Sequence, residues 1–319
     1  MAVTLTVIGM LFAGSVFAQS GVIMQKPFPE TSLPSPIEPL KIPMDGTKLY
    51  AFNFYDNNFL SLDLPGYTNR TSLLNFSHYP GGVDFDESGD LYVIRATSPI
   101  LYKVDFDTAT VTELGTVIGL PSQYLVGLAY DAQNHTMYCL QSSWGTSGSL
   151  YTIDLTNLTA TLIGTITGMT HGESLAFNLQ DHMLYAYDFK PDQSDLLRIN
   201  PATASAIVVG STTAFLNYTY GWFGDSDFND LTGELIFSTF NPGESRSSIW
   251  SIDASNSNAT LVSTQDNAQL VLSINTNSVP ISNSVPIPAL SDWGLVILLV
   301  LIIGSASLAI QRRSIVRMG

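Results

Sequence analysis

Two acidic clusters carry the residues whose spacing best suits a metal ion. They read Asp84-Phe-Asp-Glu-Ser-Gly-Asp90 and Asp225-Ser-Asp-Phe-Asn-Asp230. Alternate residues supply oxygen atoms, which Ca²⁺ prefers as ligands. The first cluster lacks the bidentate glutamate expected at the twelfth position of a calcium loop, and Asp and Asn also favour tight turns. Turn formation and a bound Ca²⁺ are therefore both open interpretations. The candidate ligands are Asp84, Asp86, Asp225 and Asp227.

A second group of polar and aromatic residues precedes four short apolar segments. Its members are His78, Tyr79, Tyr124, His171, Glu173, Tyr220 and Trp222. Aromatic rings beside polar groups suit a sugar or a loop of another protein, and the alternative is that the rings only pack between neighbouring structural units. If the protein is an enzyme, His171 and Glu173 are the catalytic candidates, acting with Asp84 and Asp227 around Ca²⁺.

The elements that must position these residues repeat five times. An apolar–Tyr pair recurs with its second residue at Tyr50, Tyr92, Tyr138 and Tyr185, and more weakly at Ile236, with spacings of 42, 46, 47 and 51 residues. Each copy contains up to four short segments rich in β-branched and aromatic residues, separated by Asp, Asn, Gly or Pro. A period of this length with four strands per unit predicts a β-propeller, in which stacked blades bury one another's faces.

The two ends of the repeat region indicate how the ring closes. The copy that begins at Lys48 has no first strand before it, whereas the last copy is followed by an unpaired apolar segment, residues 270–274. We expect this final strand to complete the first blade, which predicts an all-β fold of five four-stranded blades over residues 46–275. Proline-rich sequence before Lys48 disfavours a sixth blade.

Composition narrows the classes of function. The chain carries a net charge of −15, and 9 basic and 26 acidic residues remain when Arg312, Arg313, Arg317 and Asp292 around the apolar tail are set aside. This acidity excludes nucleic acid as a partner, because phosphate binding needs a basic surface. The single cysteine, Cys139, precludes a disulfide within the chain and is expected to be a buried, inert thiol. No nucleophile elbow, phosphate loop or zinc-protease motif occurs in the sequence.

The termini predict export. Residues 1–18 are apolar and end in small residues, as a signal peptide does, with cleavage expected between Ala18 and Gln19. Residues 19–45 form a proline-rich leader, and residues 276–288 form a polar linker after the repeats. An uncleaved N-terminal anchor is the alternative to the signal peptide.

A tail at residues 289–313 follows the linker. It contains 17 uncharged residues, Gly294 to Ile310, ahead of an arginine pair, which predicts a short transmembrane helix with a cytoplasmic C-terminal end. Residues 286–313 resemble the IPTL-CTERM sorting signal of Gram-negative bacteria, whose pattern is Ile-Pro-Thr-Leu-Ser-Glu-Trp-Gly. The matching positions are Ile287, Pro288, Ser291, Asp292, Trp293, Gly294, Arg312 and Arg313.

The resemblance implies membrane retention through the helix and contact with a sorting protease or transpeptidase. A plain membrane anchor remains the alternative. The preferred hypothesis for the whole chain is an exported, cell-surface β-propeller that binds a glycan or protein partner and needs no cofactor. One alternative is a Ca²⁺-dependent propeller hydrolase or lyase of lactonase-like type, and another is a passive structural component of the cell surface.

Overall fold

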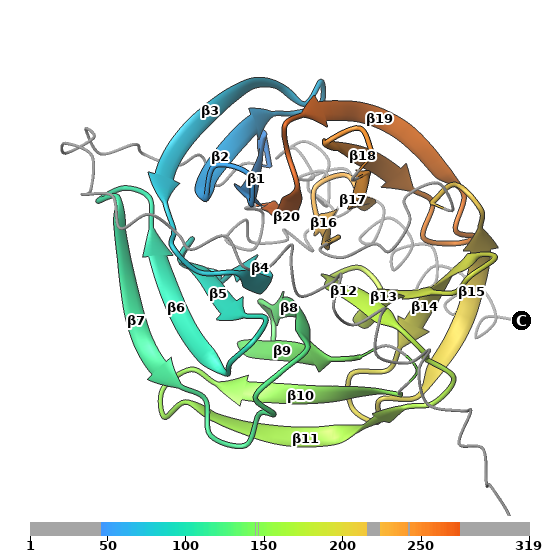
Figure 1. The fold of residues 1–319 in the computed structure, drawn as a ribbon. Coiled ribbons are helices and arrows are strands. Elements are labelled where there is room, and N and C mark those ends of the chain that lie inside the picture. The colour runs from blue at the N-terminus through green and yellow to red at the C-terminus, as the bar shows by residue number, and fades with distance from the viewer. Residues whose placement is uncertain (1–45, 144, 146, 216–223, 242, 275–319) are drawn as a thin grey trace, which may run out of the picture. The chain divides into compact units, whose positions relative to one another are not determined.

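The computed structural model describes residues 46–143, 145, 147–215, 224–241 and 243–274, which form five antiparallel sheets of four strands each. The sheets surround a central axis as the blades of a propeller (Figure 1). Blade 1 contains, from the axis outward, β20 (Leu270–Ile274), β1 (Lys48–Asn53), β2 (Asn58–Asp63) and β3 (Thr68–Asn75). Blade 2 contains β4 (Pro80–Phe85), β5 (Leu91–Arg95), β6 (Ile100–Asp105) and β7 (Thr110–Thr116). Blade 3 contains β8 (Leu125–Asp131), β9 (Thr136–Gln141), β10 (Gly148–Asp154) and β11 (Thr159–Ile166). Blade 4 contains β12 (Gly172–Asn178), β13 (Met183–Phe189), β14 (Ser194–Ile199) and β15 (Ala206–Thr212). Blade 5 contains β16 (Ser226–Asn229), β17 (Glu234–Asn241), β18 (Arg246–Ile252) and β19 (Ala259–Asp266).

The predicted ring closure is confirmed. β20, from the C-terminal end of the repeats, pairs antiparallel with β1, from their N-terminal end, with Ser273 opposite Tyr50. The expected signal peptide, leader, linker and C-terminal helix lie outside the described residues. Within the described part of the chain, no helix is long and apolar enough to cross a membrane.

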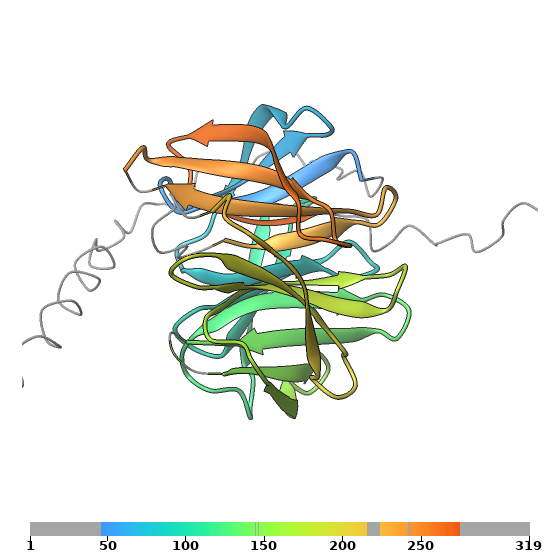
Figure 2. The same cartoon turned by 90° about the vertical axis from the view of Figure 1, so that its right-hand side faces the viewer.

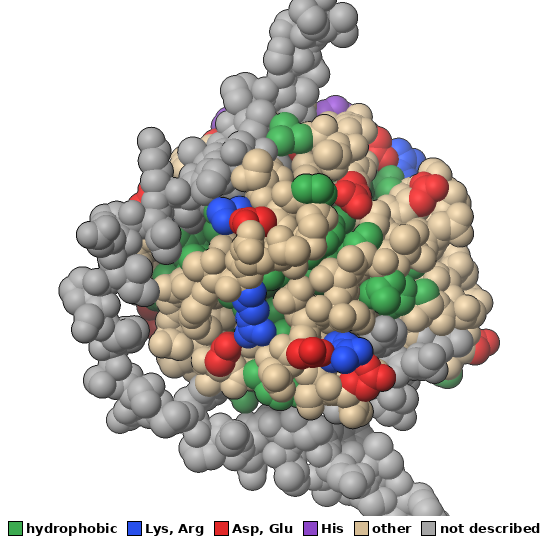
Figure 3. Space-filling view, turned by 90° about the horizontal axis from the view of Figure 1, so that it is seen from above, with side chains coloured by type: hydrophobic (Ala, Val, Ile, Leu, Met, Phe, Trp, Pro, Cys, Tyr) green, Lys and Arg blue, Asp and Glu red, His purple; other side chains and the backbone are tan. Residues whose placement is uncertain are grey.

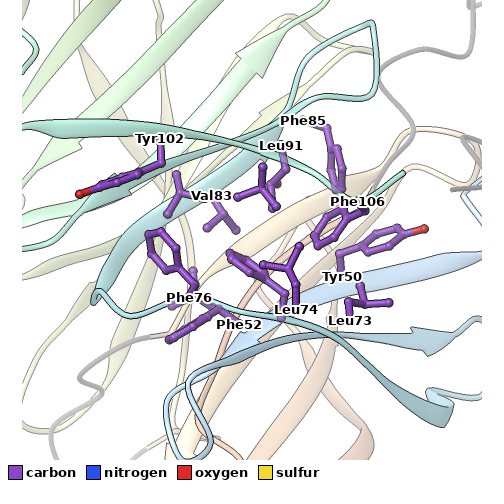
Figure 4. Packing of buried hydrophobic residues seen from close by; sticks show 14 residues of the cluster. Tyr50, Phe52, Leu73, Leu74, Phe76, Val83, Phe85, Leu91, Tyr102 and Phe106 are labelled. Atoms are coloured by element: carbon purple, nitrogen blue, oxygen red, sulfur yellow. The ribbon is translucent and has the colours of Figure 1, made fainter. Parts of the chain in front are cut away.

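The hydrophobic core lies between the blades. The second strand of each blade is buried on both faces, because each sheet is covered by a neighbouring blade on either side, as Figure 2 shows from the side. Between blades 1 and 2, Phe52, Phe76, Phe85 and Phe106 pack with Tyr50 in one continuous cluster (Figure 4). Their rings meet mostly edge to face, the arrangement that aromatic quadrupoles favour.

The innermost strands approach each other closely. A Cβ atom on Gly82 would lie 2.3 Å from the Leu128 backbone nitrogen, and one on Gly127 would lie 2.6 Å from the Leu175 nitrogen. Only glycine permits this separation between the backbones of β4, β8 and β12. The repeat thus brings the middles of the inner strands together at the axis.

The outermost strands form exposed sheet edges. Figure 3 views the ring from the side where β3 and β19 lie; uncharged polar side chains predominate there, and basic groups lie beside acidic ones. Each outer strand contains a bulge, which bends the strand and discourages pairing with another chain. The bulged residues are Leu73, Leu114, Ile163, Val209 and Val262.

Candidate functional site

One position of each inner strand forms a layer at the axis. It lies opposite the marker residue of the second strand in every blade, which makes the five positions equivalent. Going round the ring from blade 5, the residues are Asp227, Ser273, Asp84, Ala129 and Ala176. Two of the predicted metal ligands therefore flank the closing strand, and a serine of that strand lies between them.

Both carboxyl groups bind backbone N–H groups of the next blade. Asp84 Oδ2 accepts a hydrogen bond from the Tyr130 nitrogen at 2.6 Å, and Asp227 Oδ2 accepts one from the Ile274 nitrogen at 2.7 Å. Each side chain also accepts the N–H of its own following residue, Phe85 or Phe228. An innermost strand is a sheet edge whose N–H groups need acceptors, and these two aspartates supply them.

Ser273 joins the two carboxyl groups. Its hydroxyl oxygen lies 2.9 Å from Asp84 Oδ1 and 2.9 Å from Asp227 Oδ2. A hydroxyl group has one proton, so Ser273 donates to only one of the two. The second contact becomes a hydrogen bond when the other carboxyl group is protonated and donates to the serine oxygen. The geometry therefore fits a pair of aspartates that share one proton through Ser273.

The electrostatics of the layer favour the same state. Burial raises the pKa of Asp84 well above its ordinary value, and the nearby charge of Asp227 raises it further. Burial raises the pKa of Asp227 to about 7. Asp225 is fully buried, and the cost of burying its charge, together with the charges of Asp227 and Asp84, raises its pKa well above the ordinary value.

The two other predicted ligands behave differently. Asp86 Oδ1 accepts the N–H groups of Ser88 and Asp90, so Asp86 closes the turn between β4 and β5. Asp225 Oδ1 accepts the N–H of Ser226, and Asp225 Oδ2 is buried without a hydrogen-bond partner. Among the described residues, no group of three or more His, Cys, Asp or Glu side chains is placed to hold a metal ion. The expected Ca²⁺ stays a prediction.

The predicted rim residues occupy equivalent positions at one end of the axis, which we call the mouth. There the carbonyl oxygens of Tyr79, Tyr124 and His171 accept the N–H groups of Ala96, Ser142 and Phe189, each just after or at the end of a second strand. Gln269 plays this part for blade 1 by accepting the N–H of Phe54. Tyr220 and Trp222 lie outside the described residues.

Tyr124 is the rim residue most available to a partner. Its side chain is 50% exposed, and its backbone has a φ of 61°, a left-handed conformation that is rare for a large aromatic residue. Tyr55 is also exposed at the mouth and contacts Phe240 of blade 5, whereas Tyr79 stacks on Phe54 and is half-buried. The mouth therefore combines rings that wedge blades together with rings that face solvent.

His171 and Glu173 form a buried pair at the mouth. His171 Nε2 lies 3.1 Å from Glu173 Oε1, and burial raises the pKa of Glu173 while the histidine partly offsets this. The linker carrying His171 is held by Asp188, whose Oδ1 accepts the backbone N–H groups of Thr170 and His171 at 2.7 and 2.6 Å. Lys190 lies beside Asp188 and pairs with Asp195.

Sequence reasoning missed Ser273, Asp188 and Tyr55. Ser273 acquires its role only when the ring closes, because it lies 189 residues from Asp84. Asp188 follows a second strand in every respect as Asn53 does, and Asn53 Oδ1 likewise accepts the N–H of a linker residue, Gln269. Comparison of the five copies at this position was the signal that would have found it. The expected burial of Cys139 is confirmed, and burial raises the pKa of its thiol.

Comparison with known proteins supports the fold. No protein-family model matches the chain, and no curated protein matches its sequence at a significant level. A chain in a crystal structure of a nidogen/laminin complex is similar in structure, with a TM-score of 0.50 and 12% identity over 72% of this chain and 98% of that chain. A putative TolB from Agrobacterium tumefaciens gives a TM-score of 0.42 and 10% identity over 68% of this chain and 69% of that chain. TolB from Acinetobacter baumannii gives 0.44 and 10% over 69% of this chain and 53% of that chain. Identities this low show a β-propeller fold and no particular function.

Proposed function

We propose that the chain is an exported, cell-surface β-propeller that acts as an interaction module and binds its partner at the mouth. The observation that carries this proposal is Tyr124, a half-exposed aromatic ring held at the mouth by a left-handed backbone. Backbone strain at a solvent-facing residue is typical of binding sites, because the rest of the fold must hold it in place. Aromatic rings give a partner a large contact area at little cost in conformational entropy.

The two kinds of site divide the work of the domain. The aspartates of the channel accept backbone N–H groups and hold the closing strand, which is a structural task. The mouth carries exposed aromatic rings on linkers whose backbone positions are fixed by carbonyl and carboxylate hydrogen bonds. Linkers held rigidly in this way present side chains in one geometry, which lowers the entropic cost of binding.

Substitution of Tyr124 by glycine tests the proposal. Glycine adopts a positive φ without strain, so Tyr124→Gly should remove the ring while keeping the melting temperature at or above that of the wild type. We expect the full-length variant to lose binding to whichever glycans of an immobilised glycan array retain the wild-type protein. Leu231→Ala, which removes an exposed apolar side chain from the turn between β16 and β17, is the control and should bind normally.

Two results would count against an interaction module at the mouth. Tyr124→Gly could bind every ligand as the wild type does, which would place binding elsewhere. Alternatively, the protein could hydrolyse a lactone, phosphoester or glycoside at a rate abolished by Asp84→Ala or His171→Ala. That outcome would favour the enzyme alternative, in which these residues act in catalysis.

The sorting tail supports the proposed location. Its motif, apolar segment and arginine pair follow the order of the IPTL-CTERM signal, which implies retention in the membrane and processing by a membrane protease or transpeptidase. Mass spectrometry of the protein from cell envelopes tests this directly. Loss of all peptides after Trp293 would support processing, and recovery of an intact C-terminus with Arg312 and Arg313 would favour a plain anchor.

A further inference from the structure

Arg95 is the described basic residue that has no carboxylate partner. It ends β5 at the mouth, and its side chain is half-buried. Each of the other six lysines and arginines in the described ranges lies within 4.0 Å of a carboxylate oxygen. These pairs are Lys48–Asp63, Arg70–Asp56, Lys103–Asp90, Lys190–Asp195, Arg198–Asp181 and Arg246–Asp266. In so acidic a domain, an arginine without such a partner stands out.

The repeat shows that Arg95 does not do the structural work of its position. The equivalent residues at the ends of second strands include Asn53 in blade 1 and Asp188 in blade 4. Both use a side-chain oxygen to accept N–H groups of the linker that leads into the innermost strand. A guanidinium group has five donors and no acceptor, so Arg95 cannot hold its linker in this way. A residue that departs from the local rule without a structural benefit is a candidate for function.

The surroundings of Arg95 provide donors that need an acceptor. Its Nε atom is buried and has no hydrogen-bond partner. The guanidinium interacts with the hydroxyl oxygen of Tyr102, whose proton goes to Glu113 Oε2 at 3.0 Å. His78 lies against Tyr102, with the ring centroids 5.2 Å apart, and burial followed by the charge of Arg95 lowers the pKa of His78. Near neutral pH, Arg95 is thus a cation among neutral aromatic groups.

We propose that Arg95 binds the carboxylate of a uronic-acid sugar at the mouth between blades 1 and 2. The proposal deepens the function proposed above and depends on the mouth being the binding face. The planar guanidinium fork matches a carboxylate, and the neighbouring rings of Tyr79, His78 and Tyr102 suit the apolar faces of a sugar. A phosphate would fit the fork as well, but its second charge would be repelled by Glu113 and by the acidic domain.

The net charge of the domain sets a further condition on the ligand. Long-range repulsion acts on every anion, and at physiological ionic strength it is screened beyond about 8 Å. A ligand with one carboxylate per sugar-length unit gains the local contact with Arg95 while keeping its repulsion small. We therefore expect glucuronate to bind better than glucose 6-phosphate, although both carry an anion on the same hexose frame.

Calorimetric titration of the full-length protein with glucuronate, glucose and glucose 6-phosphate tests the inference. The wild type should bind glucuronate roughly 10- to 100-fold more tightly than glucose, the range for a hydrogen bond to a charged group. Arg95→Gln should abolish this preference, and Arg95→Lys, which keeps the charge and loses the fork, should retain only part of it. Arg198→Gln, which removes an arginine at the turn of Asp181 away from the mouth, should leave the preference unchanged.

A stability measurement keeps the inference falsifiable if Arg95→Gln fails to fold. Arg95→Asn restores the acceptor found in blade 1, so it should melt at or above the wild-type temperature while losing the preference for glucuronate. Equal affinity for glucuronate in the wild type and Arg95→Asn would overturn the inference, as would tighter binding of glucose 6-phosphate. If glucose and glucuronate bind equally and Tyr124→Gly abolishes both, the mouth remains the binding face and only the role of Arg95 is wrong. If no sugar binds, the carboxylate-sugar inference fails and other classes of partner must be tested at the mouth.

Discussion

Replacement of Asp227 by asparagine should change how the stability of the propeller depends on pH. The fold raises the pKa of Asp227 from its ordinary value of 3.8 to about 7 because the carboxyl group is buried. A carboxyl group whose pKa is higher in the folded state favours folding when it is protonated. Its contribution is complete below the unfolded pKa and is lost as the pH rises through the folded pKa. The wild type should therefore lose stability between pH 5.5 and pH 8.

The magnitude follows from proton linkage. Each pKa unit corresponds to about 1.4 kcal/mol, and pH 5.5 lies about 1.5 units below the folded pKa of Asp227. The free energy of unfolding should fall by roughly 2 kcal/mol from this group between pH 5.5 and pH 8. Asparagine cannot titrate, and its amide can still accept one backbone N–H and donate to Ser273. Asp227→Asn should lack this pH dependence.

Urea unfolding of the full-length wild type and variant at both pH values measures the effect. The difference in unfolding free energy between the two proteins cancels the titration of all other groups, provided that they are unaffected by the substitution. The exposed residue Asp192, in the loop between β13 and β14, supplies the control Asp192→Asn, which should follow the wild-type pH profile. If the wild type and Asp227→Asn change in parallel, to within about 0.5 kcal/mol, the proton-sharing description of the channel is wrong.

Two further predictions concern the channel. Gly127→Ala should destabilise the fold by about 1–3 kcal/mol, because its Cβ would lie 2.6 Å from the Leu175 nitrogen and push two inner strands apart. Gly66→Ala, whose Cβ would lie 3.5 Å from a threonine methyl group, should be neutral or slightly stabilising, and equal losses in both variants would contradict the close-approach argument. EDTA should leave the melting temperature at pH 6 unchanged, because the carboxyl oxygens of Asp84 and Asp227 already accept hydrogen bonds. A fall of several degrees that Ca²⁺ restores would support the calcium interpretation instead.

The fold could be predicted because its signals are local and repeated. The Leu–Tyr marker at Tyr50, Tyr92 and Tyr138 falls in second strands that are buried on both faces, so an apolar pattern was obligatory there in each copy. The unpaired segment at residues 270–274 gave the closure, because a strand without a partner in its own copy needs one in another. Repetition made each weak local signal count several times.

The site was predicted less completely because its contacts join distant parts of the chain. Asp84 and Asp227 were singled out by their type and by the alanines at equivalent positions, but not as partners that share Ser273, since that contact requires the ring to be closed. The mouth residues were placed correctly relative to the strands, and exposure then separates Tyr124 from the half-buried Tyr79. Side-chain packing between blades, which decides exposure, is not written in any one copy.

Hydrogen exchange of the full-length protein, measured with and without a saturating glycan from the array, tests the central claim most directly. If the mouth is the binding face, protection should appear in the linkers that carry Tyr79, Tyr124 and His171, while the edges of the outer strands β11, β15 and β19 exchange as in the free protein. Protection confined to those outer strands, where Leu162 and Ile207 are exposed, would contradict the account and place the interaction on the perimeter of the ring.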